Sequence, residues 1–528
     1  MYHLVHVDRL YRFQRLYPLE GAVSVLVVGS GPTGMVTALV LAANGVPCRV
    51  LERRTHPSDG SRALGLQARS MELLAGLGLA DEIERVAYRL SGASIMRGDV
   101  ELSRLTWVPP QSPYPYTYVL PQPGLESVLR KGLRAADVEI EYGAEVQNID
   151  RNDESVGVRL GDGRVLECEW LVGADGARSA VREALGIPFT GGATGETYYL
   201  GDIVLESEMS FQDSAMWLGP AGPLMLMRLP DGDGLWRVFA DMSDRSRREE
   251  LREPGITELQ RLVDERGTGG TRITQVEWTS IFRTRVCLAD KYRRGRVFLA
   301  GDAAHIFPPF GGQGMNLGIQ DAVNLAWRLV QVESGAAPDL LDGYEAERRP
   351  VAASTIRDVE SRRRMYALRN PLARSLRDLV LRLGAGIPGA ARQASLRNSQ
   401  LAVSYGDGAR WPFGRRPAIG DRAPDAVLAD GTVHDRLAVT HFTLLHFRCG
   451  NRIDGPGAPA GAVDATDRMT VVPIDDETDP KGEVRERYSI RGEGFVLVRP
   501  DGHVAYRGNE ATEVHRALAH FTGSDRAV

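Results

Sequence analysis

The chain of 528 residues carries a formal net charge of −5 and has four cysteines. Its length suggests roughly three domains and a core that can enclose a sizeable ligand, and its slight acidity argues against a nucleic-acid partner, which usually needs a basic face. Cys48, Cys168, Cys287 and Cys449 form no CxxC pair, so we expect neither a disulfide framework nor a metal site. No apolar run approaches the ~18 residues that span a bilayer, and we expect a cytoplasmic protein without a membrane partner.

Residues 1–22 precede the first predicted strand. They interleave Arg9, Arg12 and Arg15 with leucine and aromatic residues, a pattern that permits a short amphipathic helix. Because chain termini are commonly poorly ordered, we favour an N-terminal extension that packs loosely on the surface.

A βαβ unit follows this extension. Val23–Val28 is a β-branched apolar run that ends directly at Gly29, and the apolar stretch Met35–Ala43 predicts a buried helix. A second apolar strand over Cys48–Leu51 ends at Glu52. Strand, glycine turn, helix and terminal acid match the dinucleotide fingerprint G-x-G-x-x-G in this order. A nicotinamide-dependent dehydrogenase would satisfy this unit equally well.

The three glycines of the fingerprint have separate roles. Gly29 allows the tight turn, Gly31 lets the backbone approach a pyrophosphate, and Gly34 lets helix and strand pack closely. The helix N-terminus offers free N–H groups and a partial positive charge to the phosphates, and the acid at the end of the second strand is expected to accept hydrogen bonds from ribose hydroxyls. The candidate cofactor-binding residues of this unit are Gly29, Gly31, Pro32, Thr33, Gly34, Glu52 and Arg53.

Two later glycine motifs also follow a predicted strand, as the first does. Asp175 lies in Gly173-Ala-Asp-Gly176 after an apolar strand, and Asp302 ends the strand Gly295–Asp302, at the carboxyl edge where open α/β sheets bind ligands. Either aspartate alone is as readily a turn residue or a helix cap. The three motifs in this order favour one dinucleotide held along its whole length.

The segment after Asp302 breaks at two prolines and then opens a helix. Gly311-Gly312 permits close backbone approach, and the apolar pattern from Gly314 predicts a helix that runs through Leu329. The candidate cofactor-binding residues of this segment are Pro308, Gly312, Gly314, Met315 and Asn316.

With these three motifs the chain resembles the class A flavoprotein monooxygenases, aromatic hydroxylases that share the fold of para-hydroxybenzoate hydroxylase. The resemblance covers about Val23 to Leu383 and implies FAD as the cofactor. It implies that Asp302 bonds the ribitol and reaches the pyrophosphate region, and that Asp175 lies where FAD and the nicotinamide cofactor come near each other. A helix that opens at Gly314 would point N–H groups at the pyrimidine carbonyl of the flavin, where negative charge collects on reduction.

Three further residues of this chain match positions in the motifs of the family. Arg62, in the segment Ser61–Arg69, matches an arginine beside the cofactor, and Gln122 matches a glutamine that opens a helix near the ribityl chain. Val146 resembles a strand position whose backbone meets the adenine. Arg62 and Gln122 also suit surface positions at helix starts.

Residues 189–286 carry strand-like runs that predict an antiparallel sheet. In the family this sheet covers the substrate cavity above the flavin, and soft or flat side chains suit a planar aromatic guest. For any one of these side chains, ordinary core packing is the better expectation. The candidate pocket residues are Met216, Trp217, Met225, Met227, Trp236 and Phe239, together with Phe310, whose ring would narrow the cavity against very large substrates.

The tail begins a fresh segment. Thr443–Phe447, Met469–Pro473 and Gly494–Tyr506 read as strands, the last with an Asp-Gly hairpin. The tail resembles the thioredoxin-like domain of the phenol and polyketide hydroxylases. Cys449 is a single cysteine where the redox site would need two, so we expect a structural or oligomer-contact role.

The expected architecture is an α/β fold with three parts. A Rossmann-like FAD-binding domain with its helical extension covers residues 23–188 and 287–397. The antiparallel substrate domain is inserted at 189–286, and a thioredoxin-like domain lacking CxxC covers 417–528.

The resemblance implies an FAD-dependent monooxygenase that takes hydride from NADPH or NADH and hydroxylates a phenolic or polyketide-derived aromatic substrate with O2, by way of a flavin hydroperoxide. No second dinucleotide fingerprint is visible, as expected for a nicotinamide that visits transiently. No catalytic base is assigned, and His305 suits packing or hydrogen bonding. A homodimer is possible.

Other chemistries stay open at this point. Baeyer–Villiger oxygen insertion or oxidative ring cleavage would use the same cofactor site, and a flavin-dependent reductase would share the fold. A non-enzymatic redox sensor is a further alternative. A flavin halogenase is less favoured because the chain has no Trp-x-Trp-x-Ile-Pro segment.

Overall fold

The computed structural model describes most of the chain beyond the N-terminal extension. The described residues are 23–58, 60, 63–106, 112–207, 214–230, 234–247, 250–267, 269–308, 310–384, 388–406, 416–448 and 468–523. The expectations for residues 1–22, Arg62 and Cys449 therefore lie outside the described residues.

Within the described chain, one eight-stranded sheet carries the expected dinucleotide unit. Its order is β17-β18-β11-β1-β2-β8, with β10 and β9 branching from β11. The five strands from β18 to β8 run parallel, which confirms the α/β class. The strands are β1 (Val23–Val28), β2 (Cys48–Glu52), β8 (Ile140–Tyr142), β9 (Val146–Arg151), β10 (Val156–Leu160), β11 (Val165–Gly173), β17 (Arg293–Arg294) and β18 (Val297–Leu299).

Helices cover this sheet because their apolar faces need burial. α2 packs against both α9 and α5, and nearly every residue of α2 is buried because it lies between the sheet and these helices. A small sheet of order β3-β7-β4 lies beside them. The elements are α2 (Pro32–Ala43), α3 (Ala68–Ala75), α4 (Ala80–Val86), α5 (Gln122–Ala135), α6 (Ala180–Ala184), α9 (Gly314–Glu333), β3 (Gly65–Leu66), β4 (Tyr88–Leu90) and β7 (Thr117–Val119).

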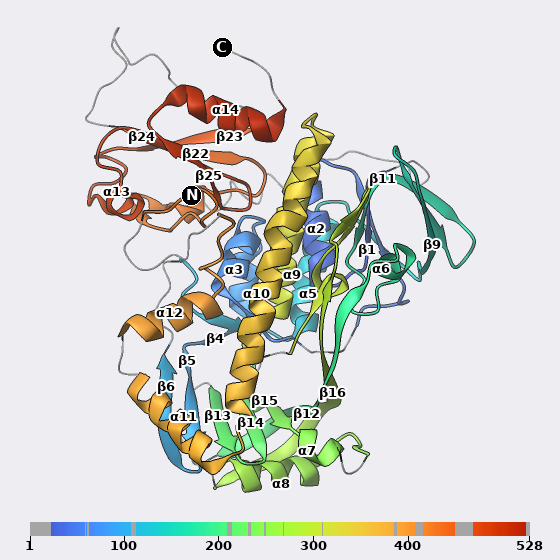
Figure 1. The fold of residues 1–528 in the computed structure, drawn as a ribbon, viewed down its shortest axis with the longest axis vertical. Helices are drawn as coiled ribbons and strands as arrows, with labels where there is room; N and C mark the ends of the chain where they lie inside the picture. Colours follow the sequence, from blue (N-terminus) through green and yellow to red (C-terminus); the bar gives the residue numbers. More distant parts are fainter. Residues whose placement is uncertain are drawn as a thin grey trace.

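A second eight-stranded sheet of the described residues lies below the first in Figure 1, in the order β19-β16-β12-β15-β14-β13-β5-β6. It is antiparallel except where β13 pairs with β5. It is larger than residues 189–286, because β5 and β6 also join it. Its strands are β5 (Gly92–Arg97), β6 (Val100–Thr106), β12 (Phe189–Ser207), β13 (Ser214–Gly219), β14 (Gly222–Arg228), β15 (Leu235–Asp241), β16 (Thr271–Ala289) and β19 (His305–Ile306).

The second sheet has two different faces, since alternate side chains of a strand point to opposite sides. α8 (Ile256–Arg266) covers one face, where Leu259 and Leu262 pack against Leu224 and Val238. The other face contributes Leu200 and its same-face neighbours to the core of the first domain. This second face is therefore the one that lies against the first domain.

Three helices and a short 3₁₀ turn connect the sheets to the tail. α10 (Asp342–Tyr366) runs along the molecule from the C-terminal domain to the second sheet, as Figure 1 shows. α11 (Pro371–Gly384) follows it, then α12 (Pro388–Asn398). The remaining short elements of the two larger parts are α7 (Ser243–Ser246), η1 (Gly301–Ala303) and η2 (Pro338–Leu341).

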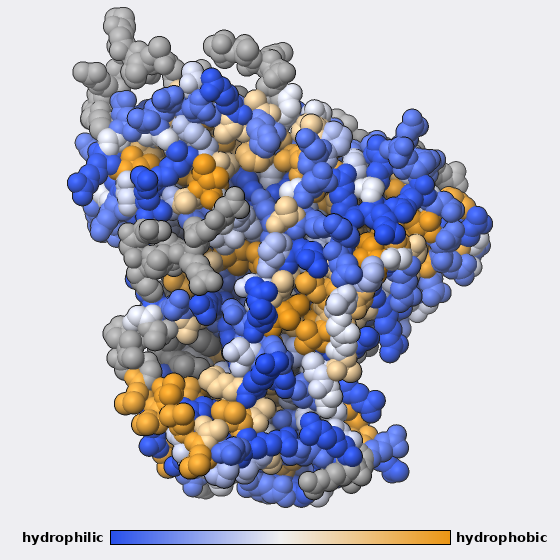
Figure 2. Space-filling model, viewed as in Figure 1, coloured by the Kyte–Doolittle hydropathy of each residue, from blue (hydrophilic) through white to orange (hydrophobic). Residues whose placement is uncertain are grey.

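α11 packs with its polar side inward. Arg377 Nη2 donates to the Leu218 carbonyl at 3.1 Å and pairs with Asp378, and both side chains are buried. The apolar side faces solvent and forms an orange patch at the lower left of Figure 2. Its exposed residues are Leu372, Leu376, Leu379, Val380 and Leu383. The expected homodimer stays a prediction.

The C-terminal part has a core of its own. Its described strands form a sheet of order β23-β22-β24-β25, in which β22 and β23 are parallel and the other pairs antiparallel. The likeness to thioredoxin stays a prediction. None of the helices that the structure describes is both long and apolar enough to cross a membrane. The elements are β20 (Val427–Leu428), β21 (Gly431–Thr432), η3 (His434–Arg436), β22 (Phe442–Phe447), β23 (Met469–Ile474), α13 (Glu483–Tyr488), β24 (Gly494–Val498), β25 (Val504–Gly508) and α14 (Ala511–Thr522).

His503 of the C-terminal domain lies beside Arg69 of the first domain, and we expect it to make this junction sensitive to acid. Burial, only partly offset by Asp501, lowers the pKa of His503 from 6.5 to about 4, so folding favours the neutral ring. Its contribution of about 3 kcal/mol is present above pH 6.5 and is lost as the pH falls toward 4. We expect the free energy of unfolding, measured in urea, to fall less between these pH values in His503→Asn than in the natural protein.

His515→Asn on α14 is the matched control, since it removes an imidazole outside this junction. An equal pH response of all three proteins would contradict the assignment.

Candidate functional site

The turn after β1 needs glycine because neighbouring backbone atoms leave no room for a side chain. Gly29 has φ +107°, and a Cβ there would lie 2.3 Å from the Ala174 carbonyl oxygen. A Cβ on Gly34 would lie 1.9 Å from the Gly29 carbonyl oxygen. Gly31 differs, because its φ is −72° and no atom of the described chain lies within 4 Å of a Cβ placed there. The space beside Gly31 thus suits the close approach of a ligand phosphate.

The first residues of α2 join the first motif to the third. Pro32 is the first helical residue, where its missing N–H costs nothing. Thr33 lies against the turn that carries Asp302, since a Cβ on Gly301 would come 2.5 Å from Thr33 Oγ1. Gly318 of α9 is equally close, with a corresponding distance of 2.3 Å. Segments nearly 300 residues apart therefore meet at the N-terminus of α2.

Glu52 ends β2 and holds the glycine turn. Its Oε2 accepts from the Ser30 amide at 3.0 Å and from the Ser30 hydroxyl at 2.8 Å, and its Oε1 accepts from the Arg54 amide at 3.0 Å. Burial alone would raise the pKa of Glu52, but these hydrogen bonds lower it below its ordinary value. The ionised carboxylate retains lone pairs for ribose hydroxyls. Arg53 is exposed beside it.

Asp175 follows β11 and has one unused oxygen. Oδ2 accepts from the Val181 amide at 3.2 Å, at the start of α6. Oδ1 is buried and has no hydrogen-bond partner in the described chain. Burial raises the pKa of Asp175 above its ordinary value. A buried polar atom without a partner is costly, so this carboxylate fits a site that a polar cofactor completes.

Asp302 is exposed on η1, at the carboxyl end of β18. Asp321 holds this turn in place. Its Oδ2 accepts from the Gly301 amide at 3.2 Å and lies 2.7 Å from His305 Nε2. Burial would raise the pKa of Asp321, but Arg348 and His305 keep it below its ordinary value. His305 is fully buried and makes a hydrogen bond to a carboxylate, whereas Asp302 faces outward.

Asn316 ties the start of α9 to two other segments. Its Oδ1 accepts from the Gln67 amide at 2.8 Å, and its Nδ2 donates to the carbonyls of Gly65 at 2.7 Å and Gly312 at 2.6 Å. Gln67 was missed in the sequence because it lies in an otherwise ordinary helix start. Gly314 opens α9, Met315 is half-buried against the core, and Pro308 is buried.

The remaining cofactor candidates lie at element ends. Gln122 opens α5, where its Nε2 donates to Glu126 Oε1 at 2.9 Å and its amide donates to the Ala63 carbonyl at 3.2 Å. Val146 is buried at the start of β9. The cofactor roles of both positions stay predictions.

An aromatic cluster joins the second sheet to the segment after Asp302. Tyr198 stacks on Phe239 with ring centroids 4.5 Å apart, and Phe310 meets both edge-on at 5.8 and 5.7 Å. The ring of Tyr366 on α10 also lies near Phe310, with centroids 6.1 Å apart. Tyr198 and Tyr366 were missed, because nothing in their local sequence marks them.

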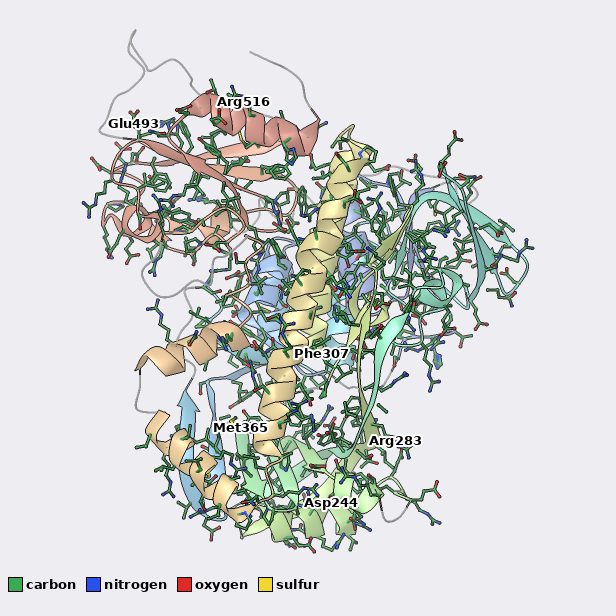
Figure 3. All side chains as sticks on the ribbon, viewed as in Figure 1. Asp244, Arg283, Phe307, Met365, Glu493 and Arg516 are labelled. Atoms are coloured by element: carbon green, nitrogen blue, oxygen red, sulfur yellow. The ribbon has the colours of Figure 1, made fainter. Side chains whose placement is uncertain are left out.

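The candidate pocket residues divide between the two faces of the second sheet. Met225 pairs with both Phe239 and Met216 across the strands, so these three share the cluster's face. Met227 lies on the same face, two residues further along β14, where it packs with Val119 and Leu229. Trp217 and Trp236 belong to the core beneath α8, so the structure does not bring them to this site. Figure 3 places Phe307 near the middle of the molecule, beside α10 and above the second sheet.

Comparison with known proteins places this geometry in a family. A family model described as "FAD binding domain" matches residues 22–359, and one described as "Aromatic-ring hydroxylase, C-terminal" matches residues 416–524. The chain belongs to the class A FAD-dependent aromatic hydroxylases. This hydroxylase binds FAD through its first domain. Asp175 Oδ1, which has no hydrogen-bond partner in the described chain, and the open space beside Gly31 both fit this cofactor.

Relatives of the hydroxylase match it nearly from end to end. It is 32% identical to rifampicin monooxygenase of Streptomyces venezuelae, covering 95% of this chain and 99% of the relative. It is 33% identical to 6-methylpretetramide 4-monooxygenase of Streptomyces rimosus, covering 92% and 91% of the two chains. The solved structure of the anhydrotetracycline hydroxylase OxyS from Streptomyces rimosus superposes with a TM-score of 0.77 at 30% identity, covering 96% of this chain and all of that one.

Proposed function

We propose that the hydroxylase uses FAD, O2 and either NADPH or NADH to hydroxylate a phenolic or polyketide-derived aromatic substrate in the cytoplasm. FAD supplies the redox chemistry of the reaction, by the hydroperoxide route that the family resemblance implies. The chain's own residues bind FAD, orient the substrate and exclude water. Because the phenolate of the substrate can activate its own ring, we assign no catalytic residue.

The aromatic cluster carries this proposal. Tyr198, Phe239 and Phe310 present ring faces and edges beside the turn that follows Asp302, and Met225 lies next to them across the sheet. Flat and polarisable side chains suit a planar aromatic guest. The named substrates of the relatives, a rifamycin and tetracycline precursors, are aromatic polyketides, which supports the same class here.

The test is oxygen incorporation by the purified, FAD-loaded enzyme. With NADPH or NADH and ¹⁸O-labelled O2, a panel of phenols and aromatic polyketides is expected to yield a product with one labelled hydroxyl on the ring, located by mass spectrometry and NMR. A labelled lactone would indicate Baeyer–Villiger chemistry, and a labelled ring-opened acid would indicate ring cleavage. Reduced product without label would indicate a reductase. Any of these three results overturns the proposed hydroxylation.

Phe310 is expected to limit substrate size. Phe310→Leu removes part of a ring that contacts Tyr198, Phe239 and Tyr366. We expect kcat/KM for fused-ring substrates to rise about threefold to tenfold relative to single-ring phenols, measured as a ratio within each enzyme. Phe447→Leu, which lies in the separate core of the C-terminal part, is the matched control and should leave the ratio unchanged. An unchanged ratio in Phe310→Leu would remove Phe310 from the pocket.

A further inference from the structure

A hairpin of the C-terminal domain lies directly against the helices of the flavin domain. Arg69 of α3 donates to the Asp501 carbonyl. From α9, Asn324 Nδ2 and Trp327 Nε1 donate to Asp501 Oδ2 at 3.0 and 3.3 Å. Gly502 has φ +73°, and a Cβ there would make a tight contact of 3.1 Å with Arg69 Nη1. The hairpin tip between β24 and β25 is thus fitted to α3 and α9.

Buried charges lock this contact. Arg499 binds Glu347 of α10 through two hydrogen bonds of 2.6 and 2.9 Å and also pairs with Asp501 at 2.6 Å. At the other side of the hairpin, Glu72 of α3 accepts from Arg422 Nε at 2.8 Å. Burying charges is tolerable only where each is paired, and removing one partner is strongly unfavourable. The C-terminal domain is therefore held in one position relative to α3 and α10.

Tyr405 connects this junction to the interior of the flavin domain. Its amide donates to the Gly420 carbonyl at 2.9 Å, which attaches it to the C-terminal domain. Its ring lies 4.2 Å from the His503 ring, centroid to centroid, and the Arg499 guanidinium lies 5.2 Å from its centroid. Its hydroxyl accepts from Arg348 Nη1 at 3.1 Å. Tyr405 is thus a second link between the hairpin and α10, besides the pair of Arg499 and Glu347.

From Arg348 the contacts lead to the flavin-binding turn. Arg348 Nε donates to Asp321 Oδ1 at 2.7 Å, and its Nη2 donates to the Leu317 carbonyl in the first turn of α9 at 3.2 Å. The other oxygen of Asp321 holds the Gly301 amide and His305, as described above. A displacement of Arg348 would therefore move both the turn that carries Asp302 and the N-terminus of α9.

We propose that the C-terminal domain positions the flavin site through the line Tyr405, Arg348 and Asp321. These are positioning residues, since each acts through the next and through the Gly301–His305 turn. The inference concerns FAD binding alone and needs no particular substrate.

The test is FAD binding by Tyr405→Phe. This variant retains the ring against His503 and removes the hydroxyl to which Arg348 donates. We expect the Kd for FAD, titrated into the apo-protein without substrate, to rise about threefold to tenfold. Because the turn shifts relative to the flavin, the visible circular dichroism of the bound flavin should change as well.

Tyr488→Phe is the matched control. It removes another buried tyrosine hydroxyl, which donates to the Pro424 carbonyl at 2.8 Å inside the C-terminal core, away from this line. We expect a similar loss of urea resistance in both variants, but natural FAD affinity and flavin spectrum in Tyr488→Phe. The proposal is overturned by Tyr405→Phe binding FAD with natural affinity and spectrum, or by Tyr488→Phe weakening FAD equally.

Discussion

Gly34→Ala is expected to abolish FAD binding by disrupting the βαβ unit itself. The added Cβ would lie 1.9 Å from the Gly29 carbonyl oxygen, a backbone atom that cannot move away as a flexible side chain can. α2 would have to shift from β1, which it meets through buried residues on nearly every turn. We expect the free energy of unfolding to fall by about 3 kcal/mol or more, with almost no flavin in the purified protein. Urea unfolding and the flavin-to-protein absorbance ratio measure the two effects.

Gly31→Ala is expected to weaken FAD binding without destabilising the fold. Gly31 has an ordinary φ of −72°, and a Cβ at this position would meet only open space within the described chain, so alanine should keep or slightly raise stability. FAD affinity should nevertheless fall tenfold or more, because the methyl group would occupy the path of the pyrophosphate. Natural FAD affinity in Gly31→Ala, or natural stability in Gly34→Ala, would contradict the roles given to these glycines.

The two glycines also show why the βαβ unit could be predicted from the sequence. A tight turn between a parallel strand and a helix requires glycine at fixed spacings. Gly29, Gly31 and Gly34 have these spacings in the sequence. β1, α2 and β2 accordingly lie where the apolar runs predicted them. The helix from Gly314 is also confirmed, because its apolar pattern is long and regular.

The substrate face could not be predicted in the same way. Strand alternation alone does not show that Met225 and Trp236 lie on opposite faces of the sheet. Their relative position also depends on the register between β14 and β15, which is set by pairing across the sheet. Which face of the second sheet lies against the first domain depends on α8, because α8 covers the opposite face. β5 and β6 join the sheet because β5 pairs with β13, although about 120 positions separate these two strands in the sequence, and no local pattern predicts that pairing.

The buried polar contacts were invisible for a related reason. Asn316 meets Gly65 across 251 positions of sequence, and Asp321 meets Arg348 across 27. Each residue alone reads as an ordinary helix residue. Their roles follow from the packing of α9 between the glycine turn, α3 and α10, which only the folded chain supplies.

Asp302→Ala is expected to purify with much less bound FAD. Asp302 is exposed on η1 beside the N-terminus of α2, and the family resemblance implies that it bonds the ribitol. A hydrogen bond to a charged group contributes about 1.5–3 kcal/mol, which corresponds to about tenfold to a hundredfold in the Kd for FAD. Titration of the apo-protein with FAD, followed by flavin fluorescence, measures the loss.

Asp339→Ala provides the matched control for this variant. Asp339 is likewise an exposed aspartate on a 3₁₀ turn, η2, but it lies away from the three glycine motifs. It should bind FAD with natural affinity. Asp302→Asn, which keeps an acceptor oxygen but no charge, should fall between alanine and the natural residue, since charge-assisted hydrogen bonds are roughly twice as strong as neutral ones. Equal FAD content in all three variants and the natural protein would show that the turn after β18 does not contact the cofactor, and the assignment of the third motif would fail.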